Sequence, residues 1–325
     1  MTDIIPVVSG EIVSTDTPED RISDFLDSLD VAEKSRATYE RSLRQFILWL
    51  YESGRHTLEL QREDILAYKE YLAGSKSAYT VTLYLTSVRK LYQWLESKRA
   101  YPDITRGIKG AKKPKGFRKD TLSQEQLTQT LASIDAQTLE GLRDCAIFNL
   151  MARTGLRCIE VSRALVEDIR MEQGQEVLWI QGKGRDCKDE FVLLLPEALM
   201  LIKAYLQARG RVRKEEPLFC SHSDRNRGEA LSTRSISRII KNSMRAVGLD
   251  DSRLTAHSLR HTAITQCISG GASMEQAQAM ARHTDSKTTL AYFHNLERVS
   301  SGAEKFIHFD MPDSVLEACM AVNSA

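Results

Sequence analysis

Residues 256–262 read AHSLRHT, and residues 286–293 read SKTTLAYF. In the first stretch His257, Arg260 and His261 stand at i, i+3 and i+4, so a helix places them on one face. That face is too polar for an ordinary buried stripe. In the second stretch Ser286 is a suitable N-cap, and nothing breaks a helix before Tyr292. A tyrosine (Tyr292), two histidines (His257 and His283) and a guanidinium (Arg260) gathered in one place suit chemistry on an anionic group.

The length and composition are those of a two-domain protein without a membrane span. The 325 residues exceed the ~250–300 at which single cores stop growing. No apolar run approaches the ~18 residues of a membrane helix, and the acidic N-terminus lacks signal-peptide features, so we expect a cytoplasmic protein with no membrane partner. Six scattered cysteines form no CxxC pair, which argues against a zinc site or a disulfide framework.

The formal net charge of +1 hides an uneven distribution along the chain. Residues 1–30 hold eight acidic residues and one basic residue, whereas residues 31–119 hold nineteen basic and nine acidic residues. Such a basic segment is typical of a nucleic-acid-binding surface. A merely solvated basic face is an equal alternative from charge alone.

Helical periodicity predicts an all-α bundle over residues 18–105, preceded by a flexible tail at 1–17. Apolar residues recur at helical spacing from Pro18 onward, with Thr17 as cap, and then over about 35–52, 62–72 and 78–97. Residues 106–120 follow as a basic linker, in which glycines and a proline separate the charged residues. The linker could lie along a phosphate backbone or simply aid solubility.

Residues 121–300 predict a second domain that mixes helices with a few short strands. Helices are expected over about 124–134, 139–153, 196–207 and 233–247, with a short one beginning near 156 and mostly helix up to 293. Strand-like runs occupy 166–171, 177–180 and 191–195, and a turn containing Gly182-Lys183-Gly184 joins the last two. Residues 301–325 form a tail, in which 314–322 could be one more helix.

Three weaker motif matches fail on their flanking residues. The glycines around Lys183 lack the spacing of a P-loop, and Ser258 stands where a zinc-protease helix needs glutamate, so no metal site is predicted. No G-x-S-x-G elbow is present. None of these three motifs therefore explains the polar residues around Lys183 and His257.

The remaining motifs, in order and spacing, resemble the tyrosine recombinase (phage integrase) family. They are residues 152–161 (ARTGLRCIEV), the Gly182–Gly184 turn, residues 257–261, His283 and Tyr292. The resemblance covers about residues 20–300 and is greatest to the two-domain Xer-type recombinases. It implies a mainly α fold with a small antiparallel β-sheet, in which a helical core-binding (SAM-like) bundle precedes a mixed α+β catalytic domain.

The resemblance assigns the central chemistry to four residues. It makes Tyr292 the nucleophile, Arg157 and Arg260 the phosphate clamps, and Lys183 the acid beside the leaving oxygen. A phenol of pKa ~10 is about one part in a thousand ionised at pH 7, and two guanidiniums at the attacked phosphate would lower that pKa. A phosphotyrosine keeps the energy of the phosphodiester, so we expect rejoining without ATP, metal or another cofactor.

Three further residues complete the implied site. His257 is placed to accept the tyrosine proton or to bind the phosphate, His283 joins it, and Glu160 supports the first arginine. The sequence departs from the family at one position, because Arg282 stands where a glycine usually precedes the second histidine.

We therefore predict a site-specific DNA recombinase that acts on double-stranded DNA through a 3′-phosphotyrosine. The resemblance implies a homotetramer on two sites, with the C-terminal tail packing in trans or in cis, and it allows accessory DNA-bending proteins. The alternatives are a type IB topoisomerase, or a non-catalytic DNA-binding protein on the same fold. Helices of both domains and the linker supply the predicted DNA contacts: Arg41, Arg44, Arg89, Lys112, Lys113, Lys115, Arg234, Arg238 and Lys241.

Overall fold

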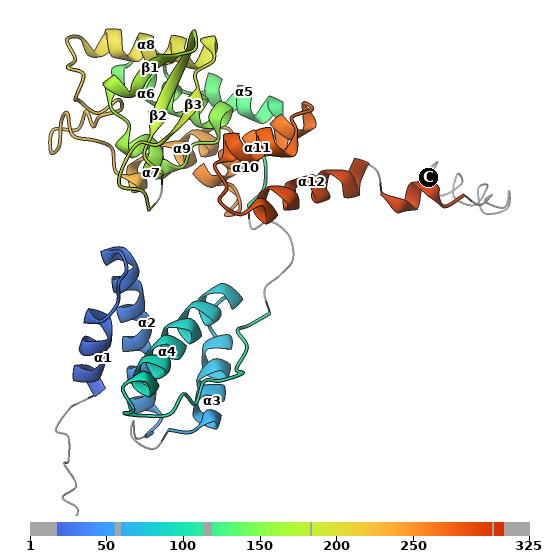
Figure 1. Cartoon of the computed structure of the whole chain (residues 1–325). Helices are drawn as coiled ribbons and strands as arrows, with labels where there is room; N and C mark the ends of the chain where they lie inside the picture. The colour runs from blue at the N-terminus through green and yellow to red at the C-terminus, as the bar shows by residue number, and fades with distance from the viewer. Residues whose placement is uncertain (1–17, 56–59, 113–118, 183, 301, 309–325) are drawn as a thin grey trace, which may run out of the picture. The chain divides into compact units, whose positions relative to one another are not determined.

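The structure is a computed structural model that describes residues 18–55, 60–112, 119–182, 184–300 and 302–308 (Figure 1). The chain divides into two compact units, residues 1–116 and 117–325. Both are built largely from helices, and the second contains a small antiparallel sheet, so the predicted fold class is confirmed. The predicted cap at Thr17 and the predicted helix at 314–322 lie outside the described residues.

The first unit is a bundle of helices around one hydrophobic core. Helix α2 packs on α4, α1 contacts both of them, and α3 packs on α4. The positions predicted to face inward, such as Phe25, Phe46 and Val88, are buried, as the helical spacing requires. The helices are α1 (Pro18–Asp27), α2 (Glu33–Glu52), α3 (Arg62–Ala73) and α4 (Ala78–Ser97).

The second unit surrounds helix α6 (Leu139–Thr154), which is buried along most of its length. Helices α8 (Pro196–Arg209) and α10 (Ala256–Ser269) both pack on α6, and α9 (Thr233–Ala246) also contacts it. The shorter helices are α5 (Gln124–Ala132), α7 (Cys158–Arg163) and α11 (Met274–Ala281). The last elements are α12 (Ser286–Ser300) and the 3₁₀ turn η2 (Ala303–Phe306).

The sheet contains β1 (Ile169–Glu172), β2 (Gln175–Ile180) and β3 (Glu190–Leu193), in the order β1-β2-β3. Both pairs are antiparallel, with Ile169 opposite Leu178 and Val177 opposite Leu193. The first strand begins later than the sequence pattern predicts. Residues Val166–Asp168 form a 3₁₀ turn, η1, because the Asp168 carboxylate accepts the backbone N–H of Leu165 at 2.7 Å.

Three helices, α10, α11 and α12, follow one another in the C-terminal part of the second unit (Figure 1). Helix α10 contacts both α11 and α12, and α11 contacts α12. The helical stretch predicted up to Phe293 is interrupted after Ser269 by two glycines and again at Arg282, and α12 runs on to Ser300. Because of these breaks, α12 packs on α10, and residues 286–293 contact residues 256–262.

Candidate active site

Arg260 connects three segments of the second unit from its position on α10. Its side chain is buried, and its Nη1 donates to the carbonyl oxygen of Gly155 at 2.7 Å. Its Nη2 donates to the carbonyl oxygen of Ala281. Gly155 ends α6 in the left-handed conformation, with φ of 62°, and so turns its carbonyl group to this guanidinium. Burial and the neighbouring arginines lower the pKa of Arg260 to about 9, which still leaves it charged at neutral pH.

Arg157 is the N-cap of α7, two residues after that turn, and is held by Glu160. The Glu160 carboxylate accepts from the backbone N–H of Arg157 and from its Nη1, each at 2.7 Å. The Glu160 side chain is fully buried, whereas 28% of the Arg157 side chain stays exposed. Burial alone would raise the pKa of Glu160, but Arg282 and Arg157 outweigh it and hold that pKa below its usual value. A charged Glu160 therefore orients a guanidinium that solvent or a ligand can reach.

Arg282, the residue that replaces the usual glycine, lies in the same cluster. It follows α11 in the left-handed conformation, with φ of 52° and ψ of 49°. Its N–H donates to Ala279 and the N–H of His283 donates to Gln278, which is the Schellman pattern that glycine normally completes. An arginine in this conformation costs roughly 1 kcal/mol. The helix therefore ends in a glycine-type turn that has an arginine at its left-handed position.

Tyr292 points from α12 into the interior and is only 4% exposed. Its hydroxyl lies 2.5 Å from Nδ1 of His261, and the His283 ring stacks beside its ring at 6.3 Å between centroids. Burial raises the pKa of Tyr292 to about 12, although Arg260 and Arg157 act in the opposite direction. The phenol is therefore protonated in the free protein, with a nitrogen base in contact.

The three histidines around the tyrosine are all biased toward the neutral form. Burial, with the charges of neighbouring arginines, lowers the pKa of His283 to about 4, and burial together with His257 and Arg260 lowers that of His261 to about 4. Partial desolvation and the charge of Arg260 also lower the pKa of His257, which is the one exposed residue of the three. Thr289 fixes the His283 ring through a 2.9 Å hydrogen bond to Nδ1. Neutral imidazoles can accept a proton at pH 7.

The arrangement is suited to a phosphate and to proton transfer. Arg157, Arg260, Arg282 and Glu160 carry a formal charge of +2 in a largely buried cluster. Guanidiniums match the geometry of phosphate oxygens, and their attraction for an anion grows where water is excluded. The cluster would stabilise the negative charge on the non-bridging oxygens of a phosphate under attack by Tyr292.

The structure brings together six of the residues predicted for the site, all within the second unit. They are Arg157, Glu160, His257, Arg260, His283 and Tyr292, linked by the contacts and charge interactions described above. Lys183 lies outside the described residues. The carbonyl oxygen of its neighbour Gly182 accepts a hydrogen bond from Arg163 of α7 at 3.3 Å, so Gly182 is tied to the helix that Arg157 caps.

Two members of this cluster were given no role by the sequence. His261 shares a helical face with His257, and that spacing was the available signal. Its bond to Tyr292 joins residues 31 apart, which no local pattern specifies. Arg282 was noticed only as a departure from the usual glycine, and its pairing with Glu160 crosses 122 residues.

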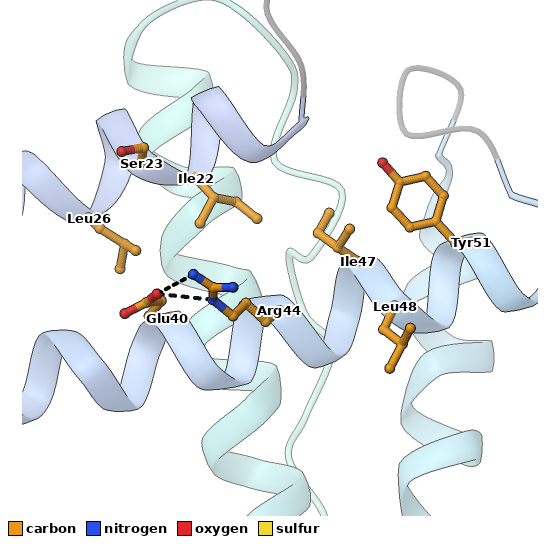
Figure 2. A pocket seen from close by; sticks show the side chains of 8 residues that line it. All are labelled: Ile22, Ser23, Leu26, Glu40, Arg44, Ile47, Leu48 and Tyr51. Carbon is orange, nitrogen blue, oxygen red and sulfur yellow. Dashed lines mark hydrogen bonds and ion pairs between the residues drawn. The ribbon is translucent and has the colours of Figure 1, made fainter.

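The arginines of α2 that were predicted to contact DNA differ in whether another side chain already pairs with them. Arg41 is exposed, whereas Arg44 pairs with Glu40 at 2.7 Å. Figure 2 shows this pair in a groove of about 480 Å³ between α1 and α2.

Arg89 of α4 holds the start of the linker, because it donates to the carbonyl oxygen of Ile108 at 2.8 Å. Lys112 is exposed, and Lys113 and Lys115 lie outside the described residues.

On α9 of the second unit, buried and exposed faces separate cleanly. Ile236, Ile240 and Met244 face the core, while Arg234 and Arg238 are exposed. Lys241 pairs with Asp250 at 3.2 Å and donates to the Asp251 carbonyl oxygen. Arg234 and Arg238 therefore present the more accessible charges of this helix.

No group of three or more histidine, cysteine, aspartate or glutamate side chains in the described part of the chain is arranged to hold a metal ion. No helix in that part is long and apolar enough to cross a membrane.

Comparison with known proteins connects this geometry to a family. The phage integrase family model matches residues 120–298, and the model of the phage integrase N-terminal SAM-like domain matches residues 22–99. Tyrosine recombinase XerD of Yersinia pestis is 30% identical over 84% of this chain and 92% of its own length. XerD of Lacticaseibacillus casei is 29% identical over 84% of this chain and 93% of its own length.

Solved structures share the fold at lower identity. XerH site-specific recombinase, bound to palindromic difH substrate in a post-cleavage complex, superposes with a TM-score of 0.70 at 20% identity, over 87% of this chain and 84% of XerH. A lambda integrase dimer bound to a core site gives 0.64 at 15% identity, over 83% and 96% of the two chains. From the family models and the XerD relatives, we conclude that this chain belongs to the phage integrase family of tyrosine recombinases.

Proposed function

We propose that this chain is a site-specific DNA recombinase that cuts and rejoins duplex DNA through a 3′-phosphotyrosine intermediate. One observation carries the proposal: the buried hydroxyl of Tyr292 contacts a neutral imidazole beside a cluster of guanidiniums. A protonated phenol is a poor nucleophile, and this setting supplies both a proton acceptor and charge stabilisation for the transition state.

The proposed reaction exchanges one phosphodiester for another. Oη of Tyr292 attacks the phosphorus while its proton passes to Nδ1 of His261, and Arg157 and Arg260 neutralise the non-bridging oxygens. The bond to the 5′ oxygen breaks, and Lys183 donates the proton that this oxygen gains. Attack by a 5′ hydroxyl on the phosphotyrosine reverses these steps. Because the number of phosphodiester bonds is unchanged, rejoining requires no ATP.

The proposed partner is double-stranded DNA. We assign residues 18–105 and 121–300 as the core-binding and catalytic domains and residues 106–120 as the linker, and we propose that the exposed cations of both domains contact the DNA backbone. The structures of XerH with difH substrate, and of a lambda integrase tetramer with a Holliday junction, are the precedents for DNA binding and for a tetramer. For this chain we propose a tetramer on two DNA sites. We place the protein in the cytoplasm.

A recombination assay tests this proposal. The DNA site would first be selected from a random duplex pool with Tyr292→Phe protein, and two copies would then be placed on one plasmid. Recombination is expected only with paired sites and active protein. Relaxation of any supercoiled plasmid without exchange between the paired sites would instead identify a type IB topoisomerase.

A further inference from the structure

The guanidinium of Arg282 connects the two halves of the arginine cluster. Its Nη2 lies 3.0 Å from Oε2 of Glu160, the carboxylate that holds Arg157. The same Nη2 lies 3.4 Å from the carbonyl oxygen of Gly155, which also accepts from Arg260 at 2.7 Å. Contacts therefore run without a gap from the guanidinium of Arg157 to that of Arg260, and Arg282 is the link between them.

The backbone conformation at residue 282 is unfavourable for an arginine, so the reason for an arginine there must lie in its side-chain contacts. The residue adopts the left-handed conformation, in which glycine is preferred. Only 2% of the side chain is exposed, so a full charge is buried, and its Nε has no hydrogen-bond partner among the described residues. What the side chain gains is the Glu160 pair and the contacts to the Gly155 and Met280 carbonyl oxygens.

We propose that Arg282 is a positioning residue for DNA cleavage, which locks Arg157, through Glu160, in a fixed geometry relative to Arg260. This inference rests on the proposed function. Glu160 bound by Arg157 alone could turn with it, whereas Glu160 held from both sides cannot. Arg282 also adds a positive charge behind the phosphate site, where a glycine would add none.

The decisive variant is Arg282→Gly, because it improves the backbone while it removes the guanidinium. If the residue served only to complete the turn after α11, the glycine variant would cleave at the wild-type rate, since glycine suits this φ. We expect adduct formation on a nicked suicide substrate carrying the selected site to slow by roughly 10- to 100-fold, as for other losses of reactant alignment. Gln173→Gly is the matched control, because Gln173 also has a positive φ, of 48°, and lies exposed in the turn between β1 and β2. Its rate should not change.

A substrate of altered charge separates positioning from a structural defect. A methylphosphonate at the cleaved position removes one of the negative oxygens that the arginines neutralise. We expect the fold-defect of Arg282→Gly to shrink on this substrate, whereas a merely structural role predicts equal fold-defects on both. Glu160→Gln combined with Arg282→Gly should slow cleavage less than the product of the single effects, because both variants break one network.

The outcomes separate this inference from the function on which it rests. Wild-type adduct formation that is lost in Tyr292→Phe upholds the function whatever Arg282 does. Wild-type cleavage by Arg282→Gly, or an equal defect on both substrates, overturns the role of Arg282. If the glycine variant does not fold, Arg282→Lys decides: a lysine cannot contact Glu160 and Gly155 as a planar fork does, and we expect slow cleavage. A wild-type rate in Arg282→Lys would refute the proposal.

Discussion

The contact between Tyr292 and His261 makes a quantitative prediction about proton transfer. With the Tyr292 pKa at about 12, pH 7 lies five units lower, so the phenolate is about one part in 100,000 and its formation costs about 7 kcal/mol. His261, with a pKa of about 4, is neutral and lies 2.5 Å from the hydroxyl. A positioned base typically contributes 10²- to 10⁴-fold. We expect His261→Asn, which keeps a polar side chain without the basicity, to slow cleavage about 100-fold at pH 7.

The pH dependence gives the sharper test of the same reasoning. In the wild type the base is available above its pKa of about 4, so the rate should be nearly flat between pH 6 and 9. In His261→Asn the rate should follow the phenolate fraction and rise about tenfold per pH unit, because the Tyr292 pKa lies far above this range. The assay is single-turnover adduct formation on the suicide substrate, resolved on denaturing gels.

A matched control comes from the nucleophile's own helix. His294 lies on α12 with 66% of its side chain exposed, and His294→Asn should leave both the rate and its pH profile unchanged. A His261→Asn variant that cleaves within twofold of wild type, with the same flat profile, would refute His261 as the proton acceptor.

Three further predictions address charge in the site and the linker. Arg260→Lys should lower the rate of adduct formation by about 10²- to 10³-fold with little change in DNA affinity. The reason is that a lysine lacks the planar fork that can reach two carbonyl oxygens and a phosphate. An equal loss of DNA affinity would contradict a role of Arg260 in the transition state. Glu160→Gln should lower the free energy of unfolding by about 3 kcal/mol in urea at pH 7. Folding lowers the pKa of Glu160, so the stability difference between wild type and variant should vanish as the pH falls through the pKa of the folded state. A difference that stays constant with pH would contradict the ion pairs of Glu160 with Arg157 and Arg282. Lys112→Ala with Lys113→Ala should reduce the slope of log Kd against log salt by about 1.8, and an unchanged slope would remove the linker from the interface.

Local patterns were sufficient to locate most of the helices. Helix α4 has the predicted limits, Ala78 and Ser97, because its apolar seam repeats at helical spacing and Ser77 caps it. The start of β1 could not be found in the same way. Val166 continues a strand-like run, but the buried Asp168 carboxylate closes a turn and binds Lys188 at 2.6 Å, a partner twenty residues away.

The site shows the same division between local and tertiary information. The face shared by His257, Arg260 and His261 follows from helical geometry, and the order of motifs indicated Tyr292. That His261 contacts Tyr292 depends on how α12 packs on α10. That the Arg282 guanidinium pairs with Glu160, more than a hundred residues earlier, depends on how α7 and the end of α11 come together. These pairings become visible only in the folded chain.

The identity of the nucleophile is the central claim, and trapping the protein on DNA tests it most directly. The wild type and Tyr292→Phe would be incubated with the nicked suicide substrate, adducts would be counted on denaturing gels, and the DNA-linked peptide would be identified by mass spectrometry. We predict a wild-type adduct on the peptide that contains Tyr292, and none from Tyr292→Phe despite unchanged DNA affinity. An adduct that persists in that variant, or that maps to another residue, would contradict the account.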